Sequence, residues 1–295
     1  MERGAQLKRE VTEYLRQRGA DLVGFAPAAR WDEVAEVPAF ARPRALFAEC
    51  RTVIVVGLSM PLPIVETTPS QLHAEAYSTT NRQLDALALE LVRHLNRLGH
   101  ASYFFTRDGF GSLNVLQRER PQAAFAHLYA AKYAGLGTIG LNHCVLTPEF
   151  GPRVRFVSVF TAADIPPDAV RGRDLCIQCG SCAQMCPVQA LVPREDRVVG
   201  DFLVGPCLQR HQELTRRHAY PCGICTKVCP VGRDRALYRQ KGILNKYREE
   251  AEALAANPED PRYASWTHVR RYGAYPEQKE ELEAPKAREQ EREGR

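Results

Sequence analysis

Eight cysteines lie within a stretch of 54 residues in this 295-residue chain, and their spacing is suited to iron–sulfur chemistry. The first run has the pattern C-x2-C-x2-C-x3-C-P and consists of Cys176, Cys179, Cys182 and Cys186. In bacterial ferredoxins, the first three thiolates of such a run hold one [4Fe–4S] cluster and the fourth ligates a second cluster. The second set is a single cysteine followed by C-x2-C-x3-C-P, namely Cys207, Cys222, Cys225 and Cys229. Eight thiolates are what two [4Fe–4S] clusters require.

The interleaved pattern predicts which cysteines share a cluster. One cluster takes the first three cysteines of the first run together with the distant Cys229. The other cluster takes the remaining four, which are Cys186, Cys207, Cys222 and Cys225. Two adjacent clusters make a short path for electrons, so this pattern favours a protein that transfers electrons.

Two other uses of clustered cysteines fit the chain less well. Structural zinc is held by four-cysteine sites, but a C-x2-C-x2-C triplet is unusual there. A disulfide framework belongs to exported proteins, and residues 1–20 are charged and lack the apolar segment of a signal peptide. We therefore expect metal-bound cysteines in a cytoplasmic protein. Cys50 and Cys144 remain, and we expect both to be buried small side chains, with a ligand or redox role for Cys144 as an alternative.

Composition gives broad limits only. Hydrophobic residues make up 44% of the chain and charged residues 25%, which is ordinary for a globular protein. No apolar run approaches the roughly 18–20 residues that span a bilayer, so no membrane association is expected. The net charge of +5 is compatible with an anionic or nucleic-acid substrate but does not identify one.

Hydrophobic periodicity predicts a layered α/β (α+β) domain with an open sheet, followed by a two-cluster ferredoxin-like domain. Apolar runs predict strands at residues 22–26, 52–58, 101–105 and 153–160. Amphipathic patterns predict helices at residues 7–18, 81–98, 122–134 and 241–256. We divide the chain into a cofactor and substrate domain (1–165), the cluster domain (166–235), a helical packing segment (236–275) and a charged flexible tail (276–295).

A glycine-rich element at residues 134–142 stands outside the ferredoxin pattern. Gly135, Gly137 and Gly140 would let the backbone approach a large flat or anionic cofactor closely. Their G-x-G-x-x-G spacing also matches the dinucleotide fingerprint, but that fingerprint follows a strand and opens a helix. Here the glycines follow a predicted helix and precede a predicted strand. A nucleotide site and a plain structural turn remain alternatives.

Residues 129–142 and 146–151, together with the double cysteine set and its separate Cys207, resemble the epoxyqueuosine reductase family over roughly residues 5–240. The resemblance implies a cobalamin-dependent reductase whose corrinoid lies between the two domains without a lower axial protein ligand. Electrons would pass singly from the clusters to the cobalt, and oxygen would be removed from the epoxide of a modified tRNA base in queuosine synthesis. It also implies cofactor contacts from the glycine element: Gly135, Gly137, Gly140, Asn142 and Val145.

The chain departs from this family at one chemical position. The family's proton-donating aspartate precedes the glycine element, and Pro121 or Gln122 occupies that place here. The nearest titratable substitutes are His127 and Tyr129, and Asp108 is a further candidate. Longer family members carry a C-terminal helical repeat that helps to grip tRNA, where this chain has a short charged tail. We therefore expect a short, divergent relative.

Three functions follow as hypotheses. The first is a corrinoid and iron–sulfur reductase with a low-potential electron donor of ferredoxin or flavodoxin type and with tRNA as a partner. The second is an electron-transfer protein or redox subunit without corrinoid. The third is a flavin-dependent oxidoreductase that uses the same layered domain.

Overall fold

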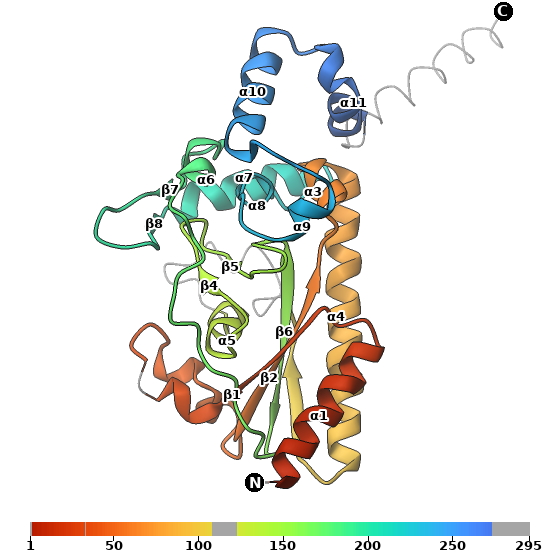
Figure 1. Ribbon diagram of the computed structural model, residues 1–295, viewed down its shortest axis with the longest axis vertical. Coiled ribbons are helices and arrows are strands. Elements are labelled where there is room, and N and C mark those ends of the chain that lie inside the picture. The colour runs from red at the N-terminus through yellow and green to blue at the C-terminus, as the bar shows by residue number, and fades with distance from the viewer. Residues whose placement is uncertain (1, 33, 108–122, 273–295) are drawn as a thin grey trace, which may run out of the picture.

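A four-stranded sheet lies between two helical layers, and the cysteine-rich segment is at one end of it (Figure 1). The computed structural model describes residues 2–32, 34–107 and 123–272. The strand order is β1 (Leu22–Pro27), β2 (Thr52–Ser59), β6 (Val154–Thr161) and β3 (Ser102–Phe105). All neighbouring strands are antiparallel. The predicted fold class, a layered mixed domain with an open sheet, is confirmed.

The central strand β2 separates two hydrophobic cores. Its side chains alternate between the two faces of the sheet, as the strand geometry requires. Val53 and Val55 belong to the first core, while Ile54 and Val56 belong to the second. All four are fully buried, which confirms the prediction of a buried central strand.

Helices α1 (Glu2–Gln17) and α4 (Gln71–Arg97) cover the second core. The predicted leucine stripe packs there, with Leu84, Leu91 and Leu95 fully buried. Helix α4 begins ten residues before its predicted start, because the Ser70 hydroxyl accepts a hydrogen bond from the backbone N–H of His73. The added turns lie next to the cysteine-rich end rather than along the sheet (Figure 1), so they need no apolar stripe.

The first core lies under shorter elements on the other face of the sheet. These are η1 (Ala28–Trp31), η2 (Ala39–Ala41), α2 (Pro43–Leu46) and α5 (His127–Tyr133). The core is aromatic: the Phe125 ring meets the Phe160 ring edge-on at 4.8 Å, and the Trp31 ring meets Tyr133 edge-on at 5.0 Å. Helix α5 is shorter than the predicted 122–134, whose first residue lies outside the described part of the chain.

The cysteine-rich segment contains only short elements apart from one helix. They are α6 (Ser181–Gln184), β7 (Leu191–Val192), β8 (Asp201–Phe202), α7 (Val204–Arg216), α8 (Ile224–Lys227) and α9 (Asp234–Leu237). A third, small core joins this segment to the following helix and consists of Leu141, Cys182, Leu191, Val228 and Tyr247. A core of this size favours a segment that depends on bound metal for its stability.

Three further elements complete the described chain. The hairpin of β4 (Thr138–Ile139) and β5 (Val145–Leu146) follows α5, and α3 (Leu62–Glu66) follows β2. After the cysteine-rich segment come α10 (Ile243–Ala256), η4 (Pro261–Tyr263) and α11 (Ala264–Tyr272). The predicted tail, residues 276–295, lies outside the described residues. Within the described ranges, no helix has the length and apolar character needed to cross a bilayer.

Candidate iron–sulfur and cofactor site

The eight cysteines surround two cavities. A small cavity of about 20 Å³ is lined by Cys176, Cys179, Cys182 and Cys229, here called the outer group. A large cavity of about 620 Å³ is lined by Cys186, Cys207, Cys222 and Cys225, here called the inner group. These are the two sets that the interleaved pattern assigns to separate clusters. Among the described residues, no three His, Cys, Asp or Glu side chains are placed to share a single metal ion.

The Cys179–Cys182 and Cys222–Cys225 loops each turn sharply at a glycine. Gly180 and Gly223 have φ values of +73° and +64° and directly precede the one-turn helices α6 and α8. A Cβ on Gly223 would lie 2.7 Å from Thr68 Oγ1, whose hydroxyl donates a hydrogen bond of 2.7 Å to the carbonyl oxygen of Cys222. The turn therefore requires glycine, because other residues rarely adopt this conformation and no space is left for a side chain.

The cysteine sulfurs need a positive partner. Burial, with a smaller contribution from the neighbouring cysteines, raises the pKa of Cys182 and of Cys207 to about 12. Burial also raises the pKa of Cys229 to about 11, although the backbone N–H of Val231 and the guanidinium of Arg153 act in the opposite direction. Crowded, buried thiolates are unstable alone, and iron supplies the charge that keeps such ligands deprotonated. The donor set therefore fits iron–sulfur clusters.

Two of the five predicted cofactor residues line the large cavity. Asn142 and Val145, at the turn of the β4–β5 hairpin, form part of its wall. Asn142 also lines the small cavity, and its Nδ2 donates to the carbonyl oxygen of Cys225 at 3.5 Å. The tip of the hairpin thus lies between the two cysteine groups.

The three glycines of the glycine-rich element pack closely against other parts of the protein. A Cβ on Gly135 would lie 2.2 Å from the carbonyl oxygen of Ala169, and one on Gly137 would lie 2.2 Å from that of Leu146. A Cβ on Gly140 would meet the Leu146 side chain at 2.7 Å. None of the three is part of the wall of the large cavity. Their contact with a cofactor stays a prediction, while their close packing against the protein itself is observed.

The two predicted proton donors point to different places. His127 lines the large cavity, with Nδ1 2.9 Å from the Ser158 hydroxyl and Nε2 2.8 Å from the carbonyl oxygen of Thr106. Tyr129 instead packs against the first core and stacks on the Tyr133 ring at 6.3 Å. The structure does not bring Tyr129 to the cavity. Asp108, Pro121 and Gln122 lie outside the described residues.

The large cavity has cationic and aromatic walls that the sequence did not indicate. Among the described lining residues there is no aspartate or glutamate, while the basic and phenolic side chains are Arg107, Arg155, Arg210, His73, His127, His143, His211, Tyr77 and Tyr220. They come from both halves of the chain, so no local spacing connects them. Burial lowers the pKa of His73 to about 4, which leaves this side chain neutral near pH 7.

An arginine and two tyrosines form an ordered part of this wall. The Arg155 guanidinium lies 4.5 Å from the centre of the Tyr77 ring, and its Nε donates to Asn81 Oδ1 at 3.0 Å. The Tyr77 ring meets the Tyr220 ring edge-on at 5.8 Å. These contacts connect α4 and β6 of the sheet domain to the loop before Cys222.

The leftover cysteines have different environments. Cys50 is buried at the end of the sheet, and its thiol contacts the carbonyl oxygen of Thr52. Cys144 lies on the wall of the large cavity beside Cys225 of the inner group, and its thiol donates to the carbonyl oxygen of Asn142 at 3.5 Å. Cys50 therefore agrees with the expected buried small side chain, while Cys144 lies next to a predicted cluster ligand.

Comparison with known proteins agrees with the cysteine pattern. Residues 175–233 match the family described as 4Fe-4S dicluster domain. This confirms the prediction of two [4Fe–4S] clusters, and the matched segment contains all eight cysteines of the two groups.

Curated relatives fall into two kinds. An epoxyqueuosine reductase from Bacillus anthracis is 25% identical over 253 residues, which cover 76% of this chain and 64% of the relative. A tetrachloroethene reductive dehalogenase from Dehalobacter restrictus is 26% identical over 194 residues, which cover 61% of this chain and 32% of the relative. The chain thus spans about a third of the length of that dehalogenase and just under two thirds of that of the epoxyqueuosine reductase.

Solved structures of both kinds of protein share the fold of this chain. An epoxyqueuosine reductase with an epoxyqueuosine-modified tRNA-Tyr stem loop matches 76% of this chain and 65% of its own, with a TM-score of 0.53 and 18% identity. A catabolic reductive dehalogenase in complex with 3-bromo-4-hydroxybenzoic acid matches 91% of this chain and 38% of its own, with a TM-score of 0.63 and 19% identity. The chain therefore contains a 4Fe–4S dicluster domain, and it is similar both to epoxyqueuosine reductases and to reductive dehalogenases.

Proposed function

We propose that this protein is an iron–sulfur and corrinoid-dependent reductase. The observation that carries the proposal is the large cavity, which has four cysteines on one wall and the β4–β5 hairpin and the sheet on the others. A cofactor placed there would be next to its electron source. Its volume of about 620 Å³ is in the range of cofactor pockets, and one solved neighbour with this fold is described by its B12-dependent dehalogenation.

The residues of the large cavity suit a broad, mostly apolar cofactor. Val145, Val154, Phe156 and Leu208 give it apolar walls, and Asn142 places an amide beside the inner group. A bound corrinoid would supply a low-potential cobalt centre for reductive chemistry. The protein's part is to hold the ring, exclude water and place cysteine ligands at the cavity wall.

The two cysteine groups define a direction for electrons. The outer group lies beside Ile177, whose side chain is 63% exposed, and the inner group faces the large cavity. Electrons from a low-potential donor of ferredoxin or flavodoxin type would enter at the outer group and reach the cavity through the inner group. We place this reaction in the cytoplasm, where such donors operate.

A proton source must accompany reduction, and a positioned acid contributes about 10²–10⁴-fold to such a step. We propose His127 and Tyr77 as the two candidates, because both line the large cavity. His127 already contacts Ser158 and Thr106 through its two ring nitrogens. Tyr77 carries a phenol whose ring lies 4.5 Å from the Arg155 guanidinium.

We propose two substrate classes and favour the first. Sequence similarity over 76% of the chain favours the epoxide of a modified tRNA base, which the protein would deoxygenate in queuosine synthesis. The arginines of the cavity wall, where no carboxylate is among the described lining residues, favour a second candidate, a halogenated aromatic acid, because Arg155 would attract its negative charge.

The test uses protein purified anaerobically and reconstituted with iron and sulfide. Hydroxocobalamin is added, the protein is passed over a gel-filtration column, and its absorption spectrum is recorded before and after reduction. Retained corrinoid bands that change on reduction support the proposal. Cluster bands alone would indicate an electron carrier, and a retained flavin band would indicate a flavin enzyme.

Turnover then separates the substrates and the proton donors. The loaded protein is offered an epoxyqueuosine-containing tRNA stem loop or 3-bromo-4-hydroxybenzoate, and the deoxygenated base or bromide is measured. Tyr77→Phe should lower turnover about 10²-fold or more if Tyr77 is the donor. Tyr238→Phe, a half-exposed tyrosine away from the cavity wall, is the control.

A further inference from the structure

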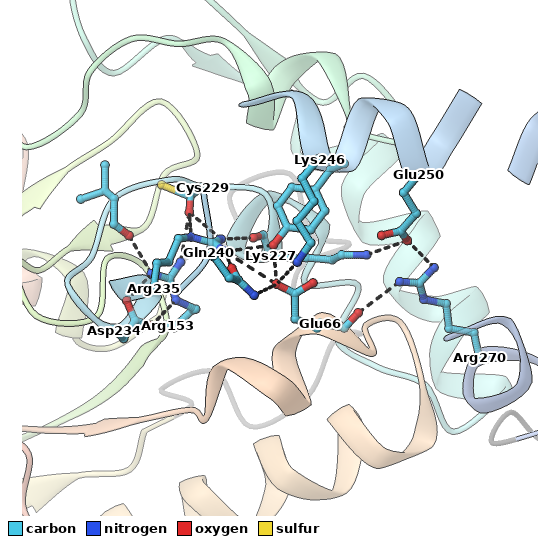
Figure 2. A network of polar contacts seen from close by, with 12 residues as sticks. Glu66, Arg153, Lys227, Cys229, Asp234, Arg235, Gln240, Lys246, Glu250 and Arg270 are labelled. Atoms are coloured by element: carbon cyan, nitrogen blue, oxygen red, sulfur yellow. Dashed lines mark hydrogen bonds and ion pairs between the residues drawn. The ribbon is translucent and has the colours of Figure 1, made fainter. Parts of the chain in front are cut away.

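A largely buried network of charged side chains lies beside Cys229 of the outer group (Figure 2). It joins segments far apart in the sequence: Glu66 from α3, Arg153 before β6, Lys227 to Arg235 in the cysteine-rich segment, α10 and Arg270 of α11. Buried charges are rare unless they are paired or serve a purpose.

Two arginines of the network face Cys229 of the outer group. Arg153 Nη1 donates to the carbonyl oxygen of Cys229 at 3.1 Å, and Arg235 donates to the same oxygen through Nε at 2.9 Å and Nη2 at 2.7 Å. Arg153 is fully buried and makes a two-bond ion pair with Asp234, at 2.6 Å and 2.7 Å. Both guanidinium groups are therefore fixed beside a predicted cluster ligand.

The other half of the network surrounds two carboxylates. Glu66 is 3.1 Å from Lys246 Nζ and 3.7 Å from Arg235 Nη1, and it accepts a hydrogen bond from the Tyr247 hydroxyl.

Glu250 is 3.1 Å from Lys227 Nζ and 2.8 Å from Arg270 Nη1. Lys227 belongs to the loop between Cys225 and Cys229 and is almost fully buried.

The network carries more positive than negative charge. Its described members include five cations, Arg153, Lys227, Arg235, Lys246 and Arg270, and three carboxylates, Glu66, Asp234 and Glu250. The network thus has an excess of two positive charges, because Glu66 and Glu250 each pair with two cations, of which Lys246 and Arg270 are partly exposed. At low effective dielectric, such an excess acts on a neighbouring charge more strongly than it would in water.

We propose that this network is the counter-charge of the cluster held by the outer group and that it sets the reduction potential of that cluster. A [4Fe–4S] cluster with four thiolates is an anion, and uptake of one electron from the donor makes it more negative without making or breaking a bond. Net charge and hydrogen bonding around a cluster tune its potential. The two buried guanidinium groups beside Cys229, together with the positive excess of the network, stabilise the reduced form, so the potential is raised.

The test is a redox titration of the reconstituted protein without corrinoid, followed by electron paramagnetic resonance. Arg235→Gln should lower the midpoint of one cluster, and Glu66→Gln should raise the same midpoint. A tenfold change in the reduced-to-oxidised ratio corresponds to about 59 mV for one electron, and we expect shifts of that order. Arg233→Gln removes an exposed charge from the same loop and should leave both midpoints unchanged.

Two outcomes would overturn the proposal. One is an unchanged midpoint in both variants at full iron content, which would make the network a purely structural feature. The other is a shift of the same sign in both variants, which would indicate a general disturbance. Where Arg235→Gln loses iron, Arg235→Lys keeps the charge and should restore both iron and midpoint. The proposal rests on the cluster assignment alone, so a failure of corrinoid binding would leave it standing.

Discussion

The cysteine sulfurs illustrate how position decides chemistry in this chain. All ten cysteines carry the same thiol, yet nine of them line the two cavities and Cys50 is buried at the end of the sheet. Cys229 comes from the second cysteine set but lies with Cys176, Cys179 and Cys182 of the first. The cysteine spacing predicted that Cys229 would join the first set, because a Cys-Pro step ends each loop and directs the last sulfur away from its own cysteine run.

Replacement of Cys229 by alanine tests the exchange at the scale of one residue. Cys229→Ala should remove one cluster, so that iron and acid-labile sulfide fall to about half. The remaining cluster should be the one held by the inner group. Iron analysis and the paramagnetic spectrum of the reduced protein measure this.

Cys50→Ala provides the matched control, because Cys50 is buried and contacts only the sheet end. It should keep full iron content. An undiminished iron content in Cys229→Ala would show that this sulfur is not a ligand.

At the scale of elements, period and capping predicted the helices and strands of the sheet domain. Strands β1, β2, β3 and β6 lie within one or two residues of their predicted ranges, because apolar runs of strand length are clear in the sequence. The first ten residues of α4 were missed because a polar face next to the cysteine-rich segment carries no apolar stripe. The glycine-rich element at residues 134–142 was recognised from its spacing, and the structure shows its glycines packed against Ala169 and Leu146.

The hairpin offers a test at this scale. Gly137→Ala would place a Cβ 2.2 Å from the carbonyl oxygen of Leu146, so β4 and β5 would have to separate. Overpacking of this kind costs about 1–3 kcal/mol, and we expect the upper end because backbone must move. Anaerobic urea unfolding followed by circular dichroism measures the change in the free energy of unfolding.

Gly172→Ala is the control for this substitution, because a Cβ there would meet no atom within 4 Å. Its effect should stay within about 0.5 kcal/mol of zero, as for other surface changes. Equal stability of the two variants would mean that the hairpin does not pack as described.

At the scale of the whole molecule, the two halves differ in what holds them together. The sheet has two large cores, each backed by helices or aromatic side chains. The cysteine-rich segment has a five-residue core, the Arg153–Asp234 ion pair and the two cysteine groups. Its order should therefore depend on iron, while that of the sheet should not.

Removal of iron by an anaerobic chelator tests this difference. Amide hydrogens of α7 should exchange at least about 100-fold faster without iron, because local unfolding becomes easy. Amides of β2 and α4 should keep their protection. Hydrogen exchange with mass spectrometry reads both regions in one experiment, and equal loss in both would show a single cooperative unit.

The cysteine spacing and the periodicity of apolar residues were enough to predict how the cysteines divide between the two cavities, the strands and most of the helices, because local geometry governs all three. The walls of the large cavity and the charged network depend on the tertiary structure alone. Glu66 and Tyr247 are 181 residues apart, and Arg153 and Asp234 are 81 apart. Contacts of that range leave no local pattern, since they arise only when the sheet and the cysteine-rich segment pack together.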